Sequence, residues 1–94
     1  MNKELITRKL IAHQYPEKQA SLVASELMAV DSSLVPYLED WIETDSETDY
    51  SVSGFSLMKL KDKYQMTYPA ALLTIDWLIK EPEVAANAIN RGIR

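Results

Sequence analysis

The stretch from Thr67 to Lys80 constrains this chain more than any other. Its sequence is TYPAALLTIDWLIK, and between Ala70 and Ile79 eight of ten residues are apolar. A helix that spans a bilayer needs about 20 apolar residues, so this run is too short to cross a membrane. It is also too apolar to lie with one face in water, which predicts a buried helix at the centre of a small domain. Asp76 and Lys80 stand four residues apart and are expected to form its only wet edge.

Four prolines divide the rest of the chain into helical segments. Each proline precedes a run with apolar residues at helical spacing and fits a first helical turn, where its missing N–H costs nothing. No alternating run is long enough to predict a strand, and 94 residues leave room for one core only. We expect an all-α fold, a compact single-domain bundle of about six short helices without a sheet, over residues 1–94. The expected helices span residues 3–13, 16–30, 34–43, 54–64, 69–80 and 82–90, and an acidic loop spans residues 44–53.

Acidic side chains are concentrated in the middle of the chain. The net charge is −4, but the segment from Gln19 to Met58 contains eight acids and no Lys, Arg or His. Residues 1–18 carry four bases against two acids, and residues 59–94 carry six bases against four acids. Nucleic acids are bound by neutralising their phosphates with cations, so this distribution disfavours a nucleic-acid partner. A basic protein is the partner that such a segment would attract.

The predicted contact surface is the acidic belt, which we define as eight side chains from residues 37 to 50. Tyrosines near both ends are residues of the kind that protein interfaces use, and they are expected to be exposed. Opposite charge on a partner would speed association, and salt would slow it. The candidate protein-binding residues are Tyr37, Glu39, Asp40, Glu43, Asp45, Glu47, Asp49 and Tyr50.

Residue types for catalysis or metal binding are scarce. There is no cysteine, only two glycines, and His13 is the only histidine, which disfavours thiolate, phosphate-loop and His-rich metal sites. Residues 45–49 offer oxygens at alternate positions, as a calcium loop does. That register, however, puts Tyr50 where a glycine is needed and Ser56 where a bidentate glutamate is needed. We therefore expect no catalytic, cofactor-binding or metal-binding residue and no enzymatic activity.

The sequence favours a small acidic helical module that binds another protein, or a second copy of itself as a homodimer. One alternative is a nucleic-acid-linked regulator of the helix-turn-helix kind, built from the helices at 54–64 and 69–80. Its second helix, however, offers no Arg, Lys, Asn or Gln between Ala70 and Ile79 to read base edges. Another alternative is an acidic DNA mimic that inhibits a DNA-binding protein, which requires carboxylates spaced like phosphates on one face.

The first residues alternate charged and apolar side chains and lack the apolar region of a signal peptide. We accordingly expect a cytoplasmic protein that does not associate with membranes.

Overall fold

A computed structural model describes residues 2–92 of the chain and groups them into two units. The first unit ends at Ser46 and the second begins at Glu47. The described residues form six α-helices, a one-turn 3₁₀ helix and a two-stranded antiparallel sheet. The all-α class is therefore confirmed, while a single domain over residues 1–94 stays a prediction. No helix between residues 2 and 92 combines the length and the apolar character that a bilayer crossing requires.

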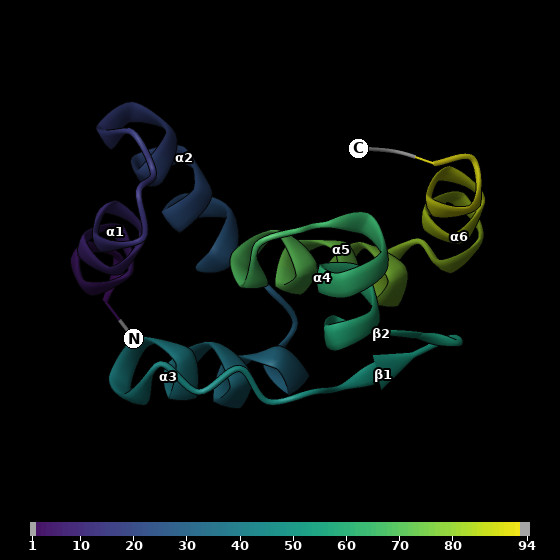
Figure 1. Cartoon of the computed structure of the whole chain (residues 1–94). Coiled ribbons are helices and arrows are strands. Elements are labelled where there is room, and N and C mark those ends of the chain that lie inside the picture. The colour runs from purple at the N-terminus through teal and green to yellow at the C-terminus, as the bar shows by residue number, and fades with distance from the viewer. Residues whose placement is uncertain (1, 93–94) are drawn as a thin grey trace. The chain divides into compact units, whose positions relative to one another are not determined.

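The first unit contains three α-helices. In order, its elements are α1 (Lys3–Ala12), α2 (Glu17–Leu27), the 3₁₀ helix η1 (Ser32–Leu34) and α3 (Val35–Thr44). Within this unit α1 packs against both α2 and α3 (Figure 1). Short polar side chains cap the starts of α1 and η1. The Asn2 carboxamide oxygen accepts the N–H of Glu4 at 2.7 Å, and the Asp31 carboxylate accepts the N–H of Ser33 at 3.1 Å. Its buried apolar residues are Ile6, Leu10, Ala20, Ala24, Leu27, Leu34, Leu38 and Trp41.

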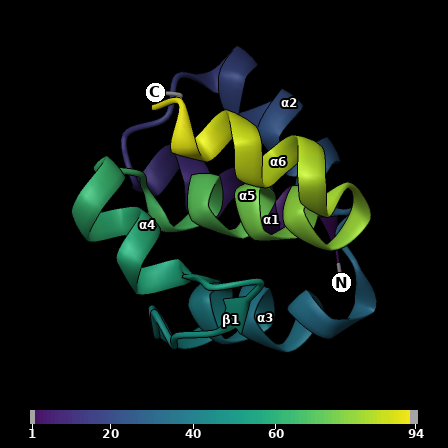
Figure 2. The same ribbon diagram turned by 90° about the vertical axis from the view of Figure 1, so that its right-hand side faces the viewer.

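The second unit places α5 between its other elements. Its elements are β1 (Ser51–Val52), β2 (Phe55–Ser56), α4 (Leu57–Tyr64), α5 (Tyr68–Lys80) and α6 (Pro82–Asn90). Helix α5 contacts α4, α6 and β1, and Figure 2 shows α6 running alongside it. Its buried apolar residues are Phe55, Leu57, Leu60, Tyr68, Ala71, Leu72, Ile75, Leu78, Ala85 and Ile89.

Helix α5 is the buried helix that the sequence predicts, with one correction. Thr67 caps its start by accepting the N–H of Ala70 at 3.3 Å, and Pro69 occupies the first turn. Asp76, however, is not on a wet edge, because only 9% of the residue is exposed. Its carboxylate accepts a hydrogen bond from the Lys80 ammonium at 2.8 Å, so the expected i,i+4 pair exists but only its lysine end is wet.

The expectation of no sheet is wrong at residues 51–56. Two strands of two residues each pair there, Ser51 with Ser56 and Val52 with Phe55. Ser53 and Gly54 connect them with φ values of 52° and 84°. Two consecutive positive φ values are the pattern of the tight turn whose twist suits a β-hairpin.

The hairpin also shifts the start of the helix expected at residue 54. Helix α4 begins at Leu57, and the Ser56 hydroxyl caps it by accepting the N–H of Lys59 at 3.1 Å. The other boundaries move by three residues or fewer. Helix α2 ends at Leu27 instead of residue 30, α3 extends to Thr44, and α6 has the expected bounds. The loop expected at residues 44–53 is accordingly shorter, because Thr44 still belongs to α3 and residues 51–52 form β1.

Candidate functional site

The acidic belt is divided between the two units. Tyr37, Glu39, Asp40, Glu43 and Asp45 belong to the first unit, and Glu47, Asp49 and Tyr50 belong to the second. Both tyrosines are half-buried, so the expectation that they are exposed is wrong. The six carboxylates fall into two groups by their contacts. We call Glu39, Asp40 and Glu43 the α3 acids, and Asp45, Glu47 and Asp49 the connector acids.

The α3 acids are exposed, and their carboxylates contact no cation or hydrogen-bond donor among residues 2–92. Glu39 and Glu43 stand four residues apart on α3, which places them on one stripe of the helix with Asp40 beside it. The backbone carbonyl of Asp40 accepts the Thr44 hydroxyl at 2.8 Å and the Ser46 N–H at 3.4 Å. These three carboxylates are therefore open to solvent and to a partner.

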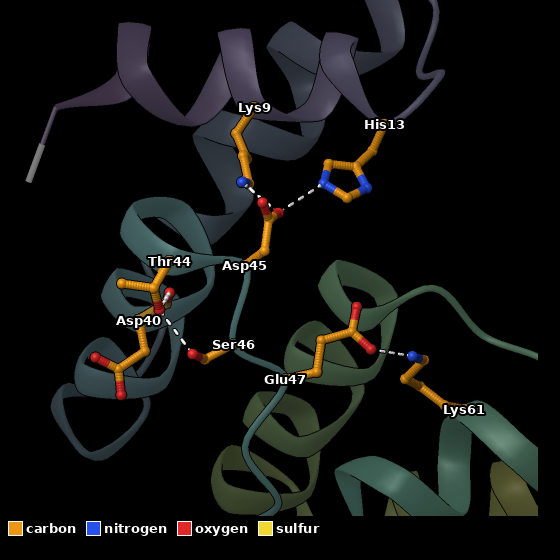
Figure 3. A network of polar contacts seen from close by, with 8 residues as sticks. All are labelled: Lys9, His13, Asp40, Thr44, Asp45, Ser46, Glu47 and Lys61. Atoms are coloured by element: carbon orange, nitrogen blue, oxygen red, sulfur yellow. Dashed lines mark hydrogen bonds and ion pairs between the residues drawn. The ribbon is translucent and has the colours of Figure 1, made fainter.

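Asp45 ends α3 in the left-handed conformation, with φ of 58°. Figure 3 shows its carboxylate facing two side chains of α1: it forms an ion pair with the Lys9 ammonium, and the His13 Nε2 lies 3.2 Å away. The Lys9 hydrogen bond first, and the His13 contact second, hold the pKa of Asp45 below its usual range. Because 64% of the Asp45 side chain is exposed, water and salt weaken both contacts.

The same two α1 side chains also lie against Trp41, which is only 1% exposed. The imidazole of His13 is 5.0 Å from the indole, centroid to centroid, and tilted by 40°. The Lys9 ammonium lies 5.6 Å above the same ring, within the range of a cation–π contact. One face of Trp41 is thus covered by the groups that bind Asp45.

The two remaining connector acids make contacts inside the second unit. Glu47 forms an ion pair with Lys61 of α4 (Figure 3). The Asp49 Oδ1 accepts the N–H groups of Tyr50 and Met58, each at 2.9 Å. Since Met58 is the second residue of α4, Asp49 satisfies one of the free N–H groups at the start of that helix.

Between these two acids, the Tyr68 hydroxyl donates to the carbonyl oxygen of Thr48 at 2.8 Å. The connector acids therefore stabilise their own units and are not a free surface. Local patterns in the sequence do not predict these contacts, because all the partners except the N–H of Tyr50 lie nine to 36 residues away along the chain.

The second helix of the helix-turn-helix alternative offers little support for that interpretation. Helices α4 and α5 exist and pack together, but in α5 only Lys80 is exposed. A recognition helix must present a polar face to a groove, and α5 has no such face. On α4, Lys61 is paired with Glu47, while the ammonium groups of Lys59 and Lys63 lie 5.7 Å and 5.5 Å from aromatic rings of their own unit.

Residues 2–92 offer little to hold a metal or cofactor. No three His, Asp or Glu side chains of this part of the chain come together as metal ligands. An open cavity of about 530 Å³ lies between the end of α4 and the start of α5, lined by Lys63, Tyr64, Gln65, Met66, Thr67 and Ala70. Its only charged group is a single ammonium, and none of its lining residues is buried.

No protein-family model matches the chain, and no curated protein and no solved structure matches it either. The function is therefore argued from the residues themselves.

Proposed function

We propose that this chain is a non-catalytic module that binds a basic surface of another protein through α3. The observation that carries the proposal is the set of α3 acids, Glu39, Asp40 and Glu43. All three are exposed on one helix of ten residues, and none contacts a cation among the described residues. Because their charge is not compensated within the chain, the whole of their attraction is available to a partner.

The connector acids are less suited to this role. Asp45 and Glu47 would each have to give up an ion pair, and Asp49 would have to leave two backbone N–H groups. Releasing such contacts subtracts from the free energy of binding, whereas the α3 acids lose only water. The proposed surface is therefore narrower than the acidic belt that the sequence suggests.

The chemistry of the α3 acids indicates the kind of partner. Guanidinium groups bind carboxylates through two parallel hydrogen bonds, so an arginine-rich segment fits better than isolated lysines. Attraction of this kind mainly raises the association rate, and salt lowers it again. A nucleic acid would instead be repelled by these carboxylates, so the regulator built on α4 and α5 has less support. For the DNA-mimic alternative, only three carboxylates of the acidic belt remain free to take the place of phosphates.

The test compares two chains with the same net charge. In one, Glu39→Gln, Asp40→Ala and Glu43→Gln neutralise the α3 acids. In the other, Glu17→Gln, Glu26→Ala and Glu83→Gln remove three exposed acids from α2 and α6. Proteins captured from cells with the wild-type chain are identified, and their association rates with each variant are measured at rising salt.

We expect the α3 variant to lose at least about tenfold in association rate at low salt, because electrostatic steering contributes factors of that order or more. The control variant should retain the rate and its salt dependence. Partners that bind the α3 variant as fast as the wild type would refute the proposal.

A further inference from the structure

Two polar side chains of the first unit lie against one large aromatic residue, and a third side chain contacts them both. Asp45 at the end of α3 contacts Lys9 and His13 of α1, and these two side chains in turn cover Trp41. The Lys9 side chain is only 16% exposed although it carries a charge, because its stem lies against the protein and its head meets both the carboxylate and the indole.

We propose that Lys9, His13 and Asp45 form a latch that salt or acid opens, and that its opening exposes Trp41 to solvent. The latch is held at a single oxygen of an exposed carboxylate, since the Lys9 ammonium and the His13 imidazole both contact the Oδ1 of Asp45. Contacts of this kind weaken as the Debye length falls from about 10 Å at 0.1 M salt to about 3 Å at 1 M. The latch can open without breaking a hydrogen bond or ion pair between two fully buried groups.

Residues 47–49, which follow the latch in the sequence, are held by a different kind of contact. In the second unit, Asp49 accepts two backbone N–H groups, and the buried Tyr68 hydroxyl holds the carbonyl of Thr48. Hydrogen bonds to backbone groups are screened by salt far less than an exposed ion pair is. The latch should therefore open while the second-unit contacts of the connector persist.

The charges around Asp45 determine its response to pH. Asp45 faces Lys9 of α1 and His13 just after α1, while the carboxylates of Asp40 and Glu43 on α3 carry the same sign and do not contact its carboxylate. Protonation of the carboxylate removes its charge and with it the attraction for the Lys9 ammonium, so acid opens the latch.

The test uses Trp41 as its own reporter. Trp77→Phe removes the other indole, and quenching of Trp41 by acrylamide, a neutral molecule, is measured from 20 mM to about 1 M NaCl at a fixed pH, where screening should be nearly complete at the upper limit. Two further chains add Asp45→Asn or Glu4→Gln to Trp77→Phe. Glu4→Gln is the matched control, because it breaks the Arg8–Glu4 pair of α1, whose side chains are 70% and 65% exposed.

We expect quenching of the reference chain to be weak at low salt and to rise severalfold at high salt. With Asp45→Asn it should already be strong at low salt and no longer depend on salt. With Glu4→Gln it should follow the reference. A reference chain whose quenching ignores salt, or an Asp45→Asn chain that quenches like the reference, would overturn the latch.

A second measurement guards against simple unfolding. Amide exchange of the wild-type chain, read by mass spectrometry, should quicken with salt in peptides covering residues 42–46, while the Met58 amide bonded to Asp49 stays protected. Equal loss of protection in both regions would mean general unfolding and would also overturn the proposal.

Discussion

The α3 acids and the connector acids are neighbours in the sequence, but they differ in whether their carboxylates contact other residues of the chain. Glu43 and Asp45 are two residues apart, yet the carboxylate of the first has no partner among the described residues and that of the second contacts Lys9 and His13. The difference arises because α3 ends between them. A helix directs successive acids outward along its free face, whereas a chain leaving the helix brings its side chains back to other elements. Composition alone therefore did not distinguish a binding surface from a structural connector.

Asp76 extends this comparison to a buried acid and should show the largest effect. We expect Asp76→Ala to lower the free energy of unfolding by about 1.5–3 kcal/mol, because it removes a hydrogen bond between charged groups in a nearly buried position. Urea unfolding measures the loss. Glu81→Ala, at an exposed position one residue beyond α5, is the control and should change little.

Asp49 comes next among the acids. Asp49→Ala should cost about 0.5–2 kcal/mol, the usual effect of losing a side chain that caps a helix start. The loss should appear in urea unfolding together with faster amide exchange at Met58, whose N–H the carboxylate accepts. A stability loss without faster exchange at that amide would mean that Asp49 acts by another route.

Asp45 should stabilise the chain in a way that depends on pH. Its pKa is lowered in the folded state, so its contribution is complete above the ordinary aspartate pKa of about 3.9 and is lost as the pH falls through the lower folded value. The stability difference between the wild type and Asp45→Asn should therefore be constant from neutral pH to about pH 5 and shrink below pH 4. Denaturant unfolding at a series of pH values checks the sign. A difference that grows as the pH falls would contradict the contacts with Lys9 and His13.

Glu43 should show the smallest effect of the series. Glu43→Ala should leave stability within about 0.5 kcal/mol of the wild type, because surface positions without contacts rarely contribute more. The same urea measurement applies. A clear loss of stability would mean that the α3 acids stabilise the fold in a way that their contacts do not show.

Much of the helical architecture follows from local signals in the sequence. Pro69 and Pro82 lie in the first turns of α5 and α6, and the apolar run between them is buried as its composition predicts. Such signals act within one helical turn, so they can be read from spacing alone. The hairpin at 51–56 was missed because two-residue strands are too short to show alternation, and a positive φ at Ser53 leaves no mark in the residue type.

The candidate site was predicted only in part. The exposed acids of α3 follow from helical spacing and from the lack of nearby bases. The partners of Asp45 and Asp49 come from residues far away in the chain, and only the folded structure brings them together. The burial of Asp76 was not predicted for a similar reason, since an acid in an apolar helix can lie at a wet edge or be buried while its lysine partner stays exposed.

Urea unfolding at neutral pH of two triple variants tests the central distinction most directly. One variant carries Glu39→Gln, Asp40→Ala and Glu43→Gln, and the other carries Asp45→Asn, Glu47→Gln and Asp49→Ala. We expect the first to unfold at the wild-type urea concentration or slightly above it, because it relieves repulsion between uncompensated carboxylates. The second should unfold at a clearly lower concentration, because it removes two ion pairs and a helix cap. Equal losses in the two variants, or a larger loss in the first, would contradict the account.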